Sequence, residues 1–288
     1  MKDDYNIKGL FMEHSEFYKI INLPEGVIEQ LDEVQQTRCS EMPEEIRVKL
    51  FNRKTWADGI EELKLYLGED PYSMKILWEQ INLICTYSYE QYVKLGLSDK
   101  IFKDTFAFIT RFVSSTKNED GKYRYNLAWW LQRQITLQEF RIGSLEYEFV
   151  ESDNNREIEI HIPSDADMNI KALCSSVADF INFEKKYFPD WCDTVITTET
   201  WMIMPELEQF LSKDSHIVKF KNLFDIDSVD YEQTWYMEWI FPGYSEINEN
   251  LPEKTTLHKK LKSYLLSGKK FGIAKGHLVL ERVYEVLK

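Results

Sequence analysis

Two polar side chains on predicted strands have the residue type and position expected of a general base. His161 follows alternating isoleucines and shares one strand face with Glu157 and Glu159. Histidine changes its protonation near neutral pH, which suits it to proton transfer, although neighbouring carboxylates favour its protonated form. The ring could instead hydrogen-bond a neighbouring strand or carboxylate in a structural role. Both interpretations of His161 remain open.

Glu199 is the second candidate base. Alternation along its predicted strand places it on one face with Val195, Thr197 and Trp201. Partial burial among β-branched and aromatic groups would raise its pKa toward the value that a base needs. An exposed or ion-paired glutamate is the alternative interpretation.

Cysteine and histidine spacing argues against a metal centre. The four cysteines (Cys39, Cys85, Cys174 and Cys192) stand far apart and form no CxxC pair. The five histidines form neither an HExxH nor an HxH pattern. Dispersed cysteines are more typical of buried free thiols than of a zinc site or a disulfide framework. The sequence therefore predicts no metal.

Charge and hydropathy limit the partners. The chain has 288 residues, of which 35 are basic and 49 acidic, so its formal net charge is −14. Such a charge repels phosphate and argues against general binding to nucleic acid or to anionic membranes. No apolar run approaches the roughly 18–20 residues that span a bilayer. Residues Met1–Tyr5 include acids where a signal peptide has a basic flank. We therefore expect a cytoplasmic protein without a nucleic-acid or membrane partner.

The residues up to about 140 have the hydrophobic spacing of helices. Beyond Gly143 the period changes to two, and predicted strands alternate with helices. The hairpin signal Asp153-Asn154-Asn155 joins the first two strands. The predicted helices of the first part follow Thr55 and cover 72–95, 98–113 and 126–140. The later strands are predicted over 145–149, 157–162, 194–202, 217–225, 234–241 and 271–280, and the helices over 169–187, 205–211 and 256–266.

The order of these later elements is that of an acyl-transfer fold, although several α+β folds share it. Short stretches of the second half, in order, resemble a bacterial family of acyltransferase-like proteins in which a helical N-terminal domain precedes a GNAT-like C-terminal domain. The matching stretches are 140–147, His161-Ile162-Pro163, 187–190, Trp201 with Pro205-Glu206-Leu207, 214–218, Leu251-Pro252 with Thr255-Thr256-Leu257, and the glycine-punctuated tail around Gly268. The resemblance implies an α+β fold with an all-helical domain over 1–140 and a GNAT-like mixed sheet, with helices on its faces, over 141–288.

The resemblance also implies a donor site for an acyl-CoA thioester beside the strand Glu157–Ile162. The pyrophosphate would lie at the N-terminus of the next helix, where unpaired amides attract anions. The residues that would bind the donor are Ile162, Ser164, Ala166, Asn169 and Lys171.

The turn at 163–169 departs from the GNAT pattern. It lacks the Arg/Gln-x-x-Gly-x-Gly/Ala signature and carries Asp165 and Asp167 where phosphates would lie. Two like charges about 4 Å apart cost roughly 4 kcal/mol at an effective dielectric constant near 20. Either aspartate could instead cap the helix. Between His258 and His277, six lysines and no acid could compensate by binding phosphates, or could form a solvated face.

Three aromatic residues of the predicted strands, Trp201, Tyr236 and Trp239, could line an acceptor pocket or pack in the core. In the family pattern a histidine is common at the position of Glu199, which leaves the role of Glu199 open. We therefore expect an N-acyltransferase that moves an acyl group from an acyl-CoA-type thioester to a small amine. The alternative is a degenerate GNAT-like module that binds a ligand or protein without catalysis. The sequence leaves the oligomeric state open.

Overall fold

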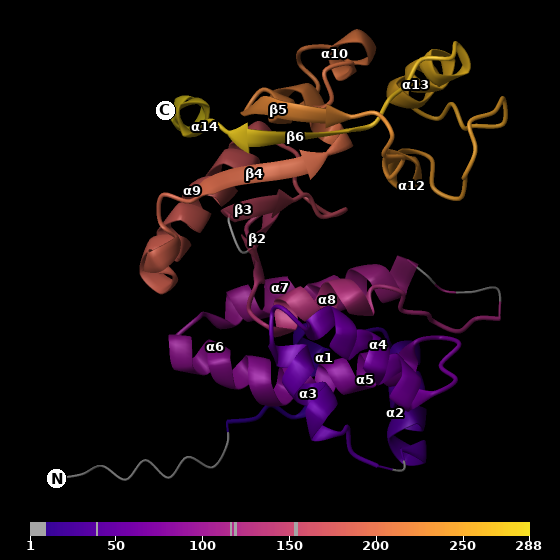
Figure 1. Cartoon of the computed structure of the whole chain (residues 1–288), viewed down its shortest axis with the longest axis vertical. Helices are drawn as coiled ribbons and strands as arrows, with labels where there is room; N and C mark the ends of the chain where they lie inside the picture. The colour runs from indigo at the N-terminus through magenta and orange to yellow at the C-terminus, as the bar shows by residue number, and fades with distance from the viewer. Residues whose placement is uncertain (1–9, 39, 116, 118–119, 153–154) are drawn as a thin grey trace. The chain divides into compact units, whose positions relative to one another are not determined.

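The computed structural model describes residues 10–38, 40–115, 117, 120–152 and 155–288 (Figure 1). The chain divides into two compact units, Met1–Arg141 and Ile142–Lys288. Within the described residues, no helix combines the length and the apolar character needed to cross a membrane.

The N-terminal unit is helical, as the sequence predicts. Phe17, Tyr92, Phe102 and Phe106 pack edge to face or tilted against one another in its core, with ring centroids 4.8–6.1 Å apart. Its helices are α1 (His14–Ile20), α2 (Glu25–Thr37), α3 (Glu44–Phe51), α4 (Trp56–Leu67), α5 (Met74–Leu83), a π-helical turn (Ile84–Ser88), α6 (Tyr89–Leu95), α7 (Asp99–Ser115) and α8 (Ala128–Ile135).

A six-stranded mixed sheet runs in the order β1-β2-β3-β4-β6-β5. β3 and β4 are parallel, whereas the pairs β2–β3, β4–β6 and β5–β6 are antiparallel. The mixed sheet with helices confirms the predicted fold class. The strands are β1 (Glu139–Ile142), β2 (Leu145–Ser152), β3 (Asn155–His161), β4 (Val195–Thr200), β5 (Phe224–Asp230) and β6 (Ile273–Leu278).

Alternation gives the sheet one apolar face and one polar face. Tyr147 pairs with Ile160 and Phe149 with Ile158, and all four are buried. Helix α9 (Ile170–Tyr187) packs on this side, where the ring of Phe180 stacks on that of Tyr147 with centroids 4.0 Å apart. The opposite face therefore holds the polar residues of β2 and β3.

The remaining helices of the C-terminal unit are short. α9 contacts both α11 (His216–Lys221) and α14 (Leu280–Leu287). The others are the 3-10 turns Pro189–Trp191 and Trp201–Ile203, α10 (Leu207–Phe210), α12 (Tyr236–Ile240) and α13 (Thr256–Leu266). In Figure 1 the α12–α13 segment lies on the side toward which β4 points.

The parallel pair β3–β4 is short. Its pairing covers only Glu157–Val195, Ile158–Ile196 and Glu159–Thr197. One residue further on, the Thr198 hydroxyl donates to the Ile160 carbonyl at 2.9 Å. The ladder between the two strands therefore ends before His161 and Glu199, and the Thr198 hydroxyl makes the next contact between them.

Two predicted strands are wrong. The segment 217–225 begins as helix α11, which Ser215 caps by accepting from the Val218 amide at 3.2 Å. Only its end enters β5. The segment 234–241 contains helix α12, whose buried Tyr236, Met237 and Ile240 follow helical spacing. In a short apolar segment the sequence alone cannot distinguish the 3.6-residue period of a helix from the two-residue period of a strand.

Other boundaries also differ from the predictions. The helix predicted to reach Phe140 ends at Ile135, because Leu137 adopts a φ of 57° and the chain then enters β1. Helix α14 was absent from the sequence prediction. In the predicted hairpin, which joins β2 to β3, Ser152 lies opposite Asn155. Asp153 and Asn154 of its turn lie outside the described residues.

Glu184 is a buried carboxylate in α9 whose Oε1 has no hydrogen-bond partner among the described residues. Burial, and secondarily the charge of Asp193, raise its pKa to about 7. Because the folded state holds this proton more tightly, ionisation between pH 4.5 and about 7 destabilises the fold.

Glu184→Gln is therefore expected to raise the free energy of unfolding by about 2 kcal/mol above pH 7. The gain should shrink as the pH falls below 7 and disappear below pH 4.5, where Glu184 is protonated in both states. Urea unfolding at pH 5 and pH 8 measures the difference. An equal effect at both pH values would contradict this account.

Candidate active site

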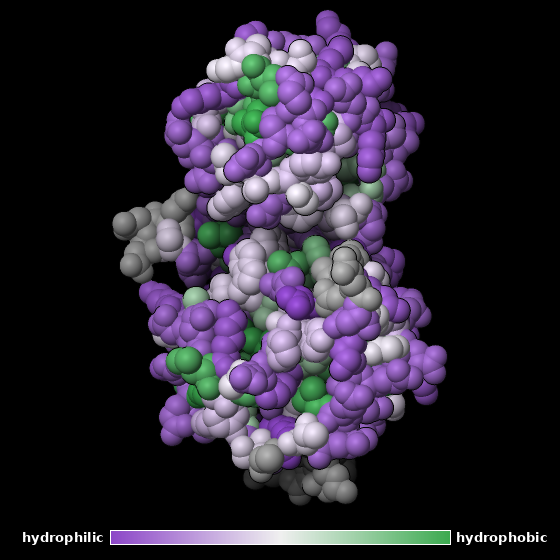
Figure 2. Space-filling view, turned by 90° about the vertical axis from the view of Figure 1, so that its right-hand side faces the viewer, coloured by the Kyte–Doolittle hydropathy of each residue, from purple (hydrophilic) through white to green (hydrophobic). Residues whose placement is uncertain are grey.

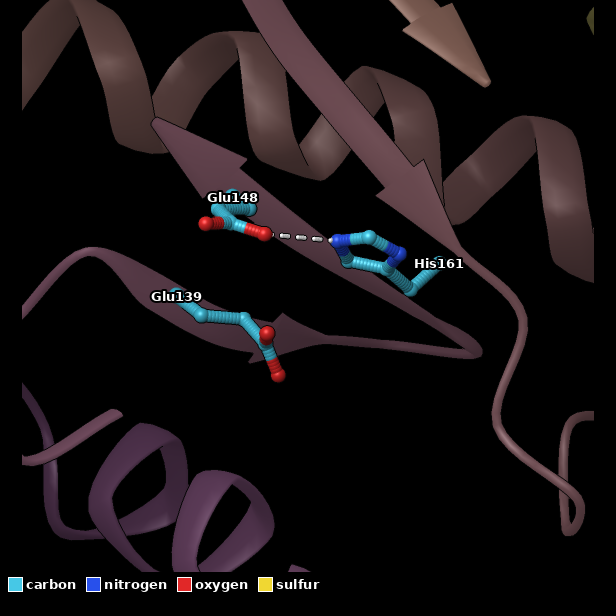
Figure 3. Close-up of side chains that lie close together, drawn as sticks. All are labelled: Glu139, Glu148 and His161. Atoms are coloured by element: carbon cyan, nitrogen blue, oxygen red, sulfur yellow. Dashed lines mark hydrogen bonds and ion pairs between the residues drawn. The ribbon is translucent and has the colours of Figure 1, made fainter. Parts of the chain in front are cut away.

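His161 and Glu148 form a hydrogen-bonded pair on the polar face of the sheet (Figure 3). His161 Nε2 lies 3.0 Å from Glu148 Oε2, and the two side chains are only 17% and 12% exposed. When Nε2–H donates to the carboxylate, Nδ1 is the nitrogen that can accept a proton. This geometry is compatible with both roles considered for His161, a general base and a structural histidine. The third side chain drawn, Glu139, belongs to the N-terminal unit, where it accepts from Trp130 Nε1 and Gln134 Nε2.

Glu159 lies between charged neighbours on the same face. Burial, opposed by His161 and reinforced by Glu148, Glu199 and Glu157, raises its pKa. Glu157 is held by Lys275 at 2.8 Å and by the Thr197 hydroxyl at 3.1 Å. Burial opposes the charge of Lys275, but the carboxylates of Glu157, Glu159 and Glu199 outweigh it and raise the Lys275 pKa. The polar face thus concentrates negative charge beside His161.

Glu199 lies two residues beyond the last pair of β3 and β4, and its side chain is exposed. Its neighbour across the strands is Lys275 of β6. The partly buried carboxylate expected from the sequence is therefore absent at this position. The structure supports the alternative of an exposed glutamate near a cation.

The turn before α9 is closed by different side chains from those expected. Asn169 caps α9, since its Oδ1 accepts from the Lys171 amide at 2.9 Å. Asp167 Oδ1 accepts from the Asn169 amide at 2.9 Å and does not itself cap the helix. Within the described residues, the amides of Ile170 and Ala172 have no hydrogen-bond partner. The helix N-terminus therefore keeps donors for an anion.

The five predicted donor-binding residues all lie on this turn or at the start of α9. Ser164, Asn169 and Lys171 are exposed, and Ile162 and Ala166 are half-buried.

Three of the six lysines between 258 and 277, Lys262, Lys270 and Lys275, form ion pairs with carboxylates of the protein itself. Lys270 pairs with Glu232 and Lys275 with Glu157, while Lys269 lies over the ring of Tyr264. Lys262 is buried, and its ammonium donates to the Glu249 carbonyl at 2.7 Å and to Glu253 Oε1 at 2.9 Å. Lys270 is exposed, as a solvated face predicts, whereas the buried Lys262 departs from that interpretation.

Two of the three predicted acceptor-binding residues meet in one pocket of the C-terminal unit. The pocket measures about 470 Å³ and includes Trp201 and Trp239. Tyr236 is only 2% exposed and instead packs its ring on Phe271, with centroids 5.0 Å apart. The remaining lining is Leu211, Ile217, Ile240, Thr255, Thr256, Leu257 and His258.

Sequence reasoning missed Glu148 and His258. The sequence shows Glu148 only as one of the polar residues that alternate with apolar ones along the predicted strand. Its place beside His161 depends on the pairing of Glu148 with Glu159 in the folded sheet. Thr255 signals the start of α13, because its hydroxyl accepts from the His258 amide at 3.1 Å.

The thiols of Cys85 and Cys174 are free and buried, and Cys192 is free and half-buried; Cys39 lies outside the described residues. Burial raises the pKa of Cys85 to about 12 and that of Cys174 to about 11.

Family comparisons assign both parts of the chain. Residues 12–137 match the N-acyltransferase N-terminal domain, and residues 139–278 match the GNAT-like C-terminal domain. The chain belongs to the acyltransferase-like family that joins these two domains. No curated protein matches it.

Solved structures show the same fold. A crystal structure of an acyltransferase in complex with decanoyl-CoA shares 17% identity, with a TM-score of 0.60, over 93% of this chain and 99% of that chain. An acyltransferase in complex with CoA and 10C-teicoplanin shares 16% identity, with a TM-score of 0.62, over 93% of this chain and 100% of that chain. At these identities the likeness establishes the acyltransferase fold.

Proposed function

We propose that the chain is a GNAT-like N-acyltransferase that moves an acyl group from an acyl-CoA thioester to an amine. The observation that carries the proposal is the hydrogen-bonded His161–Glu148 pair, which lies just beyond the last residue pair of the parallel strands β3 and β4. A thioester bound beyond the last β3–β4 pair would lie near the half-buried ring of His161 and, by the chain order of the fold, near the amides that begin α9. The acyl-CoA complexes of structurally similar acyltransferases support the same donor.

The reaction assigns a proton-transfer role to His161. The amine nitrogen attacks the thioester carbonyl, so that a C–N bond forms and the C–S bond breaks. His161 Nδ1 accepts the proton that the amine nitrogen loses, directly or through water, and the departing CoA thiolate takes a proton from the imidazolium or from water, which returns His161 to its neutral form. Glu148 stabilises the resulting imidazolium and fixes the ring through Nε2. Glu199, exposed beside Lys275, is placed to attract the ammonium form of an incoming amine.

The turn at 163–171 is proposed to hold the donor pyrophosphate. The unpaired amides of Ile170 and Ala172 supply donors, and Lys171 supplies a positive charge. Asp165 and Asp167 oppose this binding, so we expect a weak donor affinity. The pocket at Trp201 and Trp239 is proposed to hold the acceptor. The complex of a similar acyltransferase with 10C-teicoplanin supports acceptors larger than a simple amine.

A thermal-shift titration of the full chain with acetyl-, octanoyl- and decanoyl-CoA tests donor binding. A donor at 100 times its Kd is expected to stabilise the fold by about 2.7 kcal/mol. CoA release with a panel of primary amines, corrected for a no-acceptor control, then tests transfer. Binding without transfer to any amine would favour a non-catalytic ligand-binding module, and no shift with any thioester would contradict the donor site.

A further inference from the structure

The pocket around Trp201 and Trp239 is suited to an uncharged ring. Its lining contains no aspartate, glutamate, lysine or arginine. An ammonium group would lose hydration there without gaining a carboxylate partner. Its volume of about 470 Å³ lies in the range typical of small-ligand pockets. The pocket therefore fits a part of the acceptor that is remote from its reacting amine.

One end of the pocket offers hydrogen-bond donors. The first amides of α13, those of Thr256 and Leu257, have no partner among the described residues. The half-buried His258 also lines the pocket, with its ring 5.3 Å from that of Phe241, and its Nδ1 lacks a partner in the described part of the chain. Buried polar atoms are normally hydrogen-bonded. This end is therefore complementary to an oxygen atom carried by the ligand.

The aromatic wall is preformed. Trp239 is 59% exposed and Trp201 is half-buried, so part of each indole surface remains accessible to a ligand. The buried Lys262 ties the loop between α12 and α13 through Glu249 and Glu253, which fixes the helices that carry Trp239 and Thr256. Figure 2 faces this side of the molecule and shows, in the C-terminal unit, hydrophobic surface in a hollow among hydrophilic residues.

We infer that this pocket binds an aryl group of the amine acceptor, with an oxygen substituent of the ring directed at the first turn of α13. Aromatic rings gain energy from stacked or edge-on contact with indoles beyond what their burial supplies. The inference rests on the proposed acyltransferase function, because it assigns the remote part of the same acceptor whose amine receives the acyl group.

Three amines of similar size test the inference with decanoyl-CoA as donor. We expect kcat/KM to fall from tyramine to phenethylamine to 2-cyclohexylethylamine. Trp239→Leu should lower kcat/KM about 3- to 10-fold for the two aryl amines and leave that of the cyclohexyl amine within twofold. Trp235→Leu is the matched control, because Trp235 is 61% exposed on the same segment but does not line the pocket.

A binding measurement separates this inference from the proposed activity. N-Acetyltyramine has the phenol ring but no free amine, and saturation-transfer NMR detects it without turnover. Its ring protons should saturate with the wild type and with Trp235→Leu but not with Trp239→Leu. Saturation in the absence of any turnover would support the pocket and overturn the acyltransferase proposal. Turnover without a preference for aryl amines, or saturation that Trp239→Leu leaves unchanged, would overturn the pocket assignment.

Discussion

His161→Ala is expected to lower kcat/KM for acyl transfer by about 10²–10⁴-fold. The change removes the nitrogen that accepts the ammonium proton and leaves Glu148 without its 3.0 Å partner. Rates of CoA release at saturating donor measure the loss. The limb of the pH profile that reports the histidine should disappear in the variant, which a purely structural role would not produce.

Glu199→Gln is the matched comparison on the neighbouring strand. Because Glu199 is exposed, we expect this change to raise KM for the amine and to alter kcat by less than about 10-fold. Thermal unfolding of both variants checks that the sheet remains folded. A wild-type rate in His161→Ala would remove the assignment of His161 as the base.

Phe180→Ala is expected to lower the free energy of unfolding by about 3–5 kcal/mol. Phe180 is completely buried and stacks on Tyr147 of β2, so its removal leaves a cavity between α9 and the sheet. Phe149 and Phe183, whose rings lie 5.9 Å and 6.2 Å away, are also fixed in this cluster and cannot fill the space easily. Urea denaturation measures the loss.

Phe180→Leu retains an apolar side chain of intermediate volume and serves as the control. Its cost should be clearly smaller than that of the alanine variant, because less of the cavity is created. Equal costs for the two variants would mean that the aromatic contact with Tyr147, and not the lost volume, dominates at this position.

The sequence predicted the elements whose hydrophobic period is long and regular. Helix α9 and strand β3 were predicted to within two residues, because their buried faces follow one period throughout. The prediction failed for segments such as 217–225, since Val218 and Phe220 alternate like a strand and are nevertheless buried by the six-residue helix α11. The sheet order could not be derived, because β6 pairs between β4 and β5 through contacts far apart in the sequence.

The candidate site was predictable only in part. His161 was found from its residue type and strand face, but its partner Glu148 depends on the register of the hairpin. Trp201 and Trp239 meet in one pocket only because 236–240 is helical, which the predicted strand did not provide. Tyr236 points into the core for the same reason. Spacing in the sequence thus identified residue types, and tertiary pairing decided which of them come together.

The end of the β3–β4 ladder has a consequence for which substitutions the chain tolerates there. Beyond Glu159 and Thr197 the two strands no longer pair main chain to main chain, and the first contact, from the Thr198 hydroxyl to the Ile160 carbonyl, uses a side chain. Every residue type except proline supplies a main-chain N–H donor. Side chains at these positions can therefore be exchanged without loss of a main-chain donor, while proline would remove one.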